Sequence, residues 1–256
     1  MEHRRRRLRL TDRDQELLAF MAEHRLVKAA HVQALLGTSA AAAASRLRSL
    51  GGAGYVRAER IFNAQPAAHQ ITRQGLEALG SDLPAPRIDL RCYQHDIGLA
   101  WLWLAARSGR FGPMREVIGE RQMRSRDANP GRTGEPLGVR LGGVGPHGRD
   151  RLHYPDLILV TPQGRRIGVE LELSAKGQVR REKILAGYGS DPRFDAVLYL
   201  VKDRAVGESL QASARRLGIA SRVHVQRARF TGPAAGAPAS RAAERARPRA
   251  RAEATR

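Results

Sequence analysis

The sequence predicts an α/β chain, α+β overall, in which a small helical unit with two short strands precedes a larger unit built on a mixed central sheet. Helical apolar spacing recurs three times before the first strand-like segments, within residues 11–82. Strand-like and helix-like segments then alternate through residues 90–230. A length of 256 residues with 42% hydrophobic content is enough for two modest domains.

The first unit opens with three predicted helices. Thr11 is a capping residue for a helix whose apolar face comprises Leu17, Leu18, Phe20, Met21 and Leu26. A second helix is expected over residues 28–36, with Gly37 at its end. Thr38 or Ser39 can cap a third helix over residues 40–50.

Two strands at residues 54–57 and 68–71 then flank a loop at 63–66, and a closing helix begins at Thr72. This order of elements resembles a winged helix-turn-helix, a DNA-binding domain whose third helix enters the major groove. The resemblance implies contacts from Ser45, Arg46 and Arg48 on the third helix. The wing would contribute Arg57, Arg60 and His69. A helical bundle that only mediates protein contacts is the alternative.

The second unit shows a regular succession of elements. The expected segments are a helix at 93–107, a strand at 114–124, strands at 155–160 and 166–173, a helix at 175–188, a strand at 196–201, a helix at 207–217 and a strand at 222–226. Between Ser125 and Asp150 the chain is rich in glycine and contains Arg132, Arg140 and Arg149, which predicts a flexible basic loop.

Two acids stand symmetrically about the turn at residues 161–164. If the hairpin turns near Gln163, Asp156 faces Glu170 with Cβ atoms about 5 Å apart. Facing carboxylates are destabilising unless a cation offsets them, and Mg²⁺ prefers such hard oxygen ligands. Glu172 lies on the same face by strand periodicity, and Lys176 and Lys183 share one face of the following helix. An ordinary solvated hairpin face is the alternative.

The segment Pro155-Asp156, followed after thirteen residues by Glu170-Leu171-Glu172, resembles the signature of the PD-(D/E)XK nuclease superfamily. The order of helix, three strands, helix and strand is similar to the core of that superfamily. The resemblance implies Asp156 and Glu170 as metal ligands, with Glu120 as a further acid. The family's usual lysine position holds Glu172, so either Lys176 or Lys183 reaches in from the helix or the site is inactive.

Such a centre would hydrolyse phosphodiesters. A Mg²⁺ or Mn²⁺ ion on Asp156 and Glu170 would polarise the phosphate and generate hydroxide near neutral pH. A lysine would steady the developing charge or help to activate the water.

The combination of the winged helix, Glu120-Arg121, Pro155-Asp156 and Lys183 with Tyr188 also resembles the replication-relaxation family of plasmids and integrative elements. This resemblance implies a bacterial mobile-element protein that binds double-stranded DNA in replication or mobilisation, together with other replication or mobilisation proteins or as a homodimer. We expect a DNA endonuclease or nickase. A noncatalytic accessory protein and a transcriptional regulator that dimerises through its second unit are the alternatives.

Charge supports a polyanionic partner. The net charge is +20, from 45 basic and 25 acidic residues. The predicted basic arm at residues 1–10 and the predicted disordered tail at 231–256 contribute +4 each, so the middle of the chain keeps +12. Arginine enrichment in a high-GC genome is the alternative explanation.

Several other classes are disfavoured. The sequence contains neither an apolar run of membrane-spanning length nor a signal peptide, and its single cysteine, Cys92, excludes an intramolecular disulfide, so we expect a cytoplasmic protein. The scattered histidines predict no zinc site. Tyr188 as a relaxase-type nucleophile is disfavoured, and His95 is expected to cap or pack rather than to reach the acids.

Overall fold

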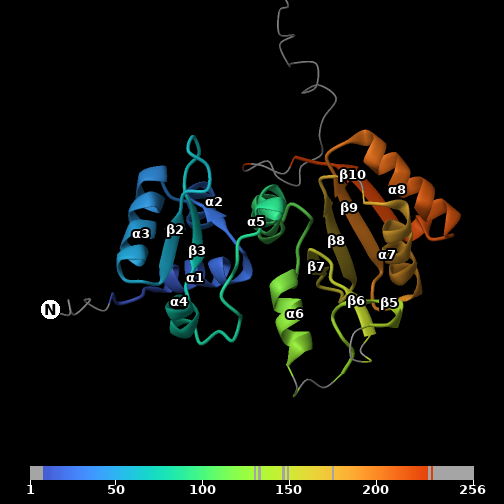
Figure 1. Cartoon of the computed structure of the whole chain (residues 1–256), viewed down its shortest axis with the longest axis horizontal. Coiled ribbons are helices and arrows are strands. Elements are labelled where there is room, and N and C mark those ends of the chain that lie inside the picture. The colour runs from blue at the N-terminus through green and yellow to red at the C-terminus, as the bar shows by residue number, and fades with distance from the viewer. Residues whose placement is uncertain are drawn as a thin grey trace, which may run out of the picture.

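The computed structural model describes residues 8–129, 131, 134–145, 148, 150–174, 176–229 and 232. The described chain is a mixed α/β structure with eight α-helices and a five-stranded mixed sheet, as the sequence predicts at this level (Figure 1). Most of the expected basic arm and almost all of the expected disordered tail lie outside the described residues.

The first unit contains three helices, a small sheet and a closing helix. Its elements are α1 (Asp12–Glu23), β1 (Val27–Lys28), α2 (Ala29–Leu36), α3 (Ala40–Gly52), β2 (Val56–Glu59), β3 (Ala68–Ile71) and α4 (Arg73–Ala78). The sheet is antiparallel with strand order β1-β3-β2.

The helix boundaries follow from capping chemistry. Thr11 and Asp14 form a reciprocal capping box at the start of α1. Gly37 ends α2 in the left-handed conformation with φ +57°, and the Ser39 side chain accepts the Ala42 N–H at the start of α3. These expectations are confirmed. The two-residue strand β1 was not expected.

The second unit is built on a five-stranded sheet of order β10-β9-β8-β7-β4. Its strands are β4 (Glu116–Gly119), β7 (Leu157–Val160), β8 (Arg166–Glu172), β9 (Ala196–Val201) and β10 (Val223–Arg227). Strands β8, β9 and β10 run parallel, whereas β7 is antiparallel to both β8 and β4. The helices are α5 (Tyr93–Arg107), α6 (Glu120–Ala128), α7 (Gln178–Ser190) and α8 (Arg204–Arg216), and short 3-10 turns occupy Leu90–Cys92 and Ala220–Arg222.

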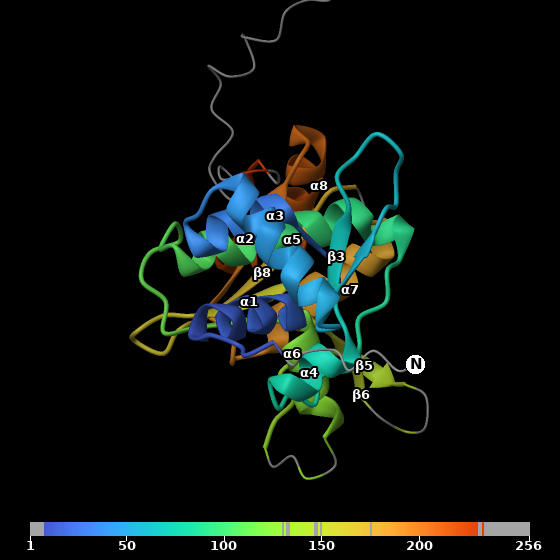
Figure 2. The ribbon, with the colours of Figure 1, turned by 90° about the vertical axis from the view of Figure 1, so that its left-hand side faces the viewer.

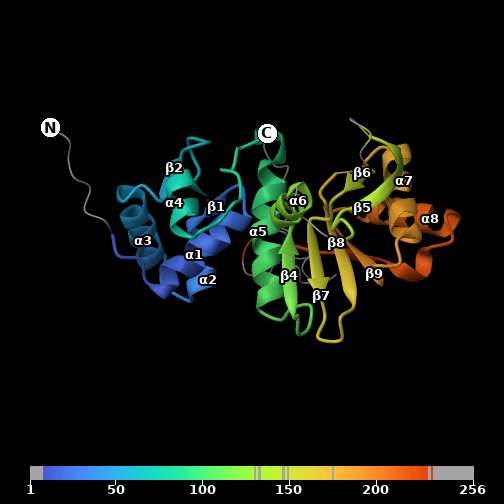
Figure 3. The same cartoon turned by 90° about the horizontal axis from the view of Figure 1, so that it is seen from below.

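The two faces of this sheet are covered by different helices (Figure 3). Leu157 and Leu159 pack with Leu102 of α5 on one face. Ile158 and Val160 point the other way and pack with residues of α7 and α8. The alternation is that of a strand buried on both sides.

Helix α5 also belongs to the core of the first unit. Ala100 joins the cluster formed by α1, α2 and α3, and Ile97 and Trp101 pack with Leu26 and Ala68. Both units are therefore packed against one helix, which lies between them in Figure 1.

Two expectations for the second unit were wrong. The strand expected at 114–124 ends at Gly119, and Glu120 is instead the first residue of α6. The apolar alternation stops at Gly119, and the following segment consists mainly of good helix formers with an acid in the first turn.

The segment expected as a loop at 125–150 contains the end of α6 and the strand β5 (Val139–Val144), which pairs with β6 (Asp150–His153). Val139 is fully buried in the cluster that includes α7 residues Ile184 and Leu185, so tertiary packing orders this glycine-rich segment. Arg140 pairs with Glu135 and Asp150, whereas Arg132 and Arg149 lie outside the described residues.

None of the helices in the described part of the chain combines the length and the apolarity that crossing a bilayer requires.

Candidate functional site: a carboxylate centre beside the first unit

The hairpin of β7 and β8 has the register that the sequence predicts. Leu157 pairs with Val169 and Val160 pairs with Arg166, so the next pair outward is Asp156 and Glu170. Gly164 supplies the left-handed turn residue, with φ +83°. The expected register is confirmed.

Asp156 is held at the end of β7 by the main chain. Its N–H donates to the Val169 carbonyl oxygen at 3.0 Å, and its carboxylate Oδ2 accepts the Leu171 N–H at 2.7 Å. The same oxygen lies 3.2 Å from Nε2 of His95 on α5. Burial lowers the pKa of His95, but the carboxylates of Asp156 and Asp96 together outweigh burial and raise it above the ordinary value. His95 therefore reaches the carboxylate of Asp156, where a capping or packing role was expected.

Glu170 is buried on the face of the sheet that α7 covers, with 2% of its surface exposed. Its Oε1 lies 2.6 Å from Nε2 of His153 and accepts the Tyr188 hydroxyl at 2.7 Å. Burial raises the pKa of Glu170, but His153, Lys176 and Tyr188 together lower it below the ordinary value. Glu170 is therefore held as a buried carboxylate.

Glu172 and Lys176 form an ion pair near this carboxylate. Burial is the main cause that raises the pKa of Glu172, and Lys176 opposes the rise. Burial lowers the pKa of Lys176, but Glu170, Glu172 and Asp156 raise it above the ordinary value. Lys176 thus carries a positive charge at neutral pH, and the negative charges of all three acids attract it.

The other expected acid and lysine lie elsewhere. Glu120 pairs with Arg25 at 2.9 Å and with Arg124 at 2.8 Å. Its N–H donates to the Asp156 carbonyl oxygen at 3.2 Å, so its backbone adjoins the centre. Lys183 is half-buried on α7, and among the described residues it forms no ion pair with the carboxylates. The structure therefore brings Lys176, and not Lys183, to Glu172.

Arg25 connects the first unit to this centre. It precedes β1, and its guanidinium contacts Glu120 and, at 3.5 Å, Asp96 of α5. A cavity of about 20 Å³, with room for about one water molecule, lies between Arg25, Asp96, Glu120 and Asp156. Asp96 is 3% exposed and its Oδ2 accepts no hydrogen bond from the described residues. Burial raises its pKa, and Arg25 opposes the rise.

The environment of Tyr188 is unsuited to a nucleophile. Burial and the neighbouring Glu170 carboxylate raise its pKa well above the ordinary value, so its hydroxyl stays protonated and donates to Glu170. Sequence reasoning missed His153, which carried no motif, and Arg25, whose partners are distant in sequence.

The residues expected to contact DNA divide into two groups. Ser45 and Arg48 are exposed on α3, which faces the viewer in Figure 2, and Arg60 is exposed after β2. Arg46 instead forms a bidentate ion pair with the buried Asp14 of α1, so its guanidinium is engaged within the fold.

The expected wing residues also have partners. Arg57 is exposed and contacts Gln70 at 3.0 Å and Glu59 at 3.1 Å. Burial lowers the pKa of the half-buried His69, whose Nδ1 has no hydrogen-bond partner among the described residues.

The donor set fits a cation held by few protein ligands. Within the described residues no group of three or more His, Cys, Asp or Glu side chains is arranged to hold a metal ion. Mg²⁺ is commonly held by one or two carboxylates together with water and substrate phosphate oxygens. Asp156 and Glu170 each use one carboxylate oxygen in the contacts described above, which leaves the second oxygen of each as a candidate ligand.

Comparison with known proteins gave no match, either to a protein-family model or to a curated protein.

Proposed function

We propose that this chain is a DNA-binding protein with a Mg²⁺-dependent phosphodiester-cleaving centre, an endonuclease or nickase. The observation that carries the proposal is the meeting of Asp156, Glu170, Glu172 and Lys176 at one end of the β7–β8 hairpin. Burying several carboxylates close together costs desolvation energy and mutual repulsion, and such clusters are typical of functional sites. In this chain, with 45 basic and 25 acidic residues, acids are also the scarcer charge.

The first unit supports DNA binding. Its order of three helices, an antiparallel hairpin and a closing helix resembles that of a winged helix-turn-helix. Helix α3 presents Ser45 and Arg48 at its exposed surface, and Arg57 and Arg60 lie on or beside the hairpin. Such side chains suit phosphate contacts and base edges in a major groove.

The second unit supports the nuclease assignment. The succession α5, β4, β7, β8, α7 and β9 follows the PD-(D/E)XK core, with α6 and the β5–β6 hairpin inserted between the first two core strands. Asp156 precedes β7 and Glu170 lies in β8, and the PD-(D/E)XK resemblance implies that these two acids are the metal ligands. A mobile-element role, with Mg²⁺ or Mn²⁺ as the cofactor, accords with the replication-relaxation resemblance.

The residues of the centre have separable roles. A Mg²⁺ ion on Asp156 and Glu170 would polarise the phosphate and lower the pKa of bound water. His95 and the Leu171 N–H orient Asp156, while Tyr188 and His153 orient Glu170. Because Lys176 remains protonated, it is suited to stabilising negative charge on the phosphate rather than to accepting a proton from water.

Supercoiled plasmid tests the proposal. Wild-type protein with Mg²⁺ or Mn²⁺ should convert it to nicked or linear DNA, and EDTA should prevent conversion. Asp156→Asn should abolish conversion and leave the fold intact, because the amide oxygen can still accept the Leu171 N–H. Asp82→Asn is the matched control, since Asp82 is exposed and has no described partner. Conversion that survives in Asp156→Asn would refute the proposed centre.

A noncatalytic DNA-binding protein is the second candidate, and one observation favours it. Glu172 occupies the family's lysine position, and its described ion-pair partner is Lys176 itself. In that case the acids would form a structural network that stabilises the hairpin. Wild-type protein would then shift duplex DNA in a gel without cutting it, and Asp156→Asn would shift it equally.

A further inference from the structure

A groove beside the carboxylate centre is lined by five arginines. It has a volume of about 670 Å³ and lies between the β2–β3 side of the first unit, residues 84–87 and the start of α6. The five arginines are Arg25, Arg57, Arg73, Arg87 and Arg121. They come from five separate segments of the chain, so the fold gathers them.

The charged side chains that line the groove are all positive. Ile71, Thr72 and the segment Pro84-Ala85-Pro86 complete its lining, so no acidic side chain of the described chain contributes to it. Arg73 and Arg87 are exposed, and neither forms an ion pair with a described residue. Arg57 is partly neutralised by Glu59, and Arg25 by Glu120 and Asp96; these acids lie outside the lining.

Arg121 is held in place by the main chain. Its Nε donates to the Ala22 carbonyl oxygen at 3.0 Å, and its Nη2 donates to the Pro84 carbonyl oxygen at 2.5 Å. Burial, and then the positive charge of Arg25, lower the pKa of Arg121. The carboxylates of Glu23, Glu120 and Asp96 partly offset the repulsion between Arg25 and Arg121, and an anionic ligand in the groove would offset the remainder.

The groove adjoins the acids. Arg25 and Arg121 line both the groove and the small cavity beside Asp156. An anionic chain lying along Arg73 and Arg87 would therefore be directed toward Asp156. This course is separate from α3, because none of the residues that line the groove belongs to that helix.

We propose that this groove binds the phosphodiester backbone of a single nucleic-acid strand and leads it to the carboxylate centre. The proposal rests on the proposed function and adds the course of the substrate strand. A volume of about 670 Å³ falls within the range of about 300–1,000 Å³ for the clefts and cavities that hold small ligands, which suits a short stretch of one strand rather than a duplex. Positively charged grooves that follow the backbone are the usual means of binding single strands.

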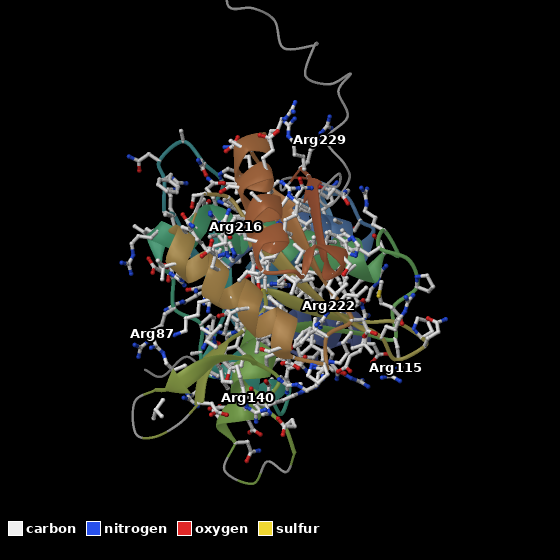
Figure 4. The ribbon with its side chains drawn as sticks, turned by 90° about the vertical axis from the view of Figure 1, so that its right-hand side faces the viewer. Arg87, Arg115, Arg140, Arg216, Arg222 and Arg229 are labelled. Atoms are coloured by element: carbon white, nitrogen blue, oxygen red, sulfur yellow. The ribbon has the colours of Figure 1, made fainter. Side chains whose placement is uncertain are left out.

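The test is a comparison of two double variants with equal loss of charge. Arg73→Gln with Arg87→Gln removes the two free arginines of the groove. Arg115→Gln with Arg229→Gln is the matched control, because both residues are exposed and lie on other sides of the molecule from Arg87 (Figure 4). Urea titrations should show that both double variants keep the wild-type fold.

Binding is measured by fluorescence anisotropy with a labelled single-stranded oligonucleotide over a series of salt concentrations, in EDTA so that no cleavage occurs. Two lost phosphate contacts on a single strand should reduce the slope of log affinity against log salt by about 1.4 in the groove variant. The control variant should keep a slope close to the wild type.

Equal changes in the two double variants would overturn the groove while leaving the proposed function standing. A loss in the groove variant that appears with a duplex probe and not with the single strand would also overturn it. Failure of the wild-type protein to bind either probe would refute the proposed function itself, and the groove with it.

Discussion

Replacing Arg46 should destabilise the fold rather than weaken DNA binding. Arg46 of α3 pairs with Asp14 of α1, whose side chain is 2% exposed while that of Arg46 is 30% exposed. In Arg46→Met the alkyl stem can still pack, but Asp14 keeps only the two Thr11 donors, at 2.8 and 2.7 Å. Losing charged hydrogen bonds costs about 1.5–3 kcal/mol and breaking a fully buried pair about 3–5 kcal/mol. Because two donors remain and Arg46 is partly exposed, we expect a loss of about 2–3 kcal/mol.

Urea titration and thermal unfolding measure this loss, which corresponds to a Tm lower by about 5–10 °C. Arg48→Met is the matched control on the same helix, since Arg48 is exposed and has no described partner. Its stability should stay within about 0.5 kcal/mol of the wild type, while its affinity for duplex DNA falls. An Arg46→Met protein that has the unfolding free energy and Tm of the wild type but binds duplex DNA more weakly would refute this reasoning.

Three further substitutions test the packing and the electrostatics. Tyr188→Phe removes a donor to Glu170 and should lower the free energy of unfolding in urea by about 1.5–3 kcal/mol; an unchanged value would mean that the bond contributes nothing. Gly75→Ala would place a Cβ 2.4 Å from the Tyr55 carbonyl oxygen, so thermal unfolding should show a loss of about 1–3 kcal/mol, and a wild-type Tm would contradict this contact. Burial raises the pKa of Glu23 from 4.5 to about 7, so the folded state holds its proton to higher pH than the unfolded chain, and the stability present at low pH is lost as pH rises through that range. Glu23→Gln should therefore exceed the wild type in urea stability by up to about 3 kcal/mol at about pH 8 and equal it at about pH 4, and a pH-independent difference would exclude this titration.

Local chemistry made much of the fold predictable. The capping box at Thr11, the left-handed Gly37 and the cap at Ser39 each act within a few residues, and the structure has all three. The hairpin register was predictable for the same reason, because the turn and the apolar alternation on both sides fix the pairing of Asp156 with Glu170.

The errors arose where distant packing decides the structure. The segment at 125–150 is rich in glycine and has weak strand propensity, yet burial of Val139 beneath α7 gives it the β5–β6 hairpin. Glu120 was expected on a strand because the predicted strand continued past the apolar residues, which end at Gly119. Its carboxylate instead meets Arg25, 95 residues away, a partner that local sequence patterns do not indicate.

The same limit applies to the site. The carboxylates Asp156, Glu170 and Glu172 stand close together in the sequence, so spacing could identify them. The residues that orient them are distant in the sequence: His95, on helix α5, lies 61 residues from its partner Asp156. The choice of Lys176 over Lys183 likewise depends on where α7 begins, because Lys176 precedes the helix and turns back to Glu172.

The shared helix α5 has a consequence for how the two units act together. One side of α5 completes the first core through Ala100 and Trp101, and another packs on the central sheet through Leu102. Arg25 adds an ion pair from the first unit to Glu120 of the second. A duplex bound on α3 would therefore lie at a fixed orientation to Asp156, without the freedom that a flexible linker gives. Such coupling makes the placement of α3 relative to Asp156 a property of the rigid fold.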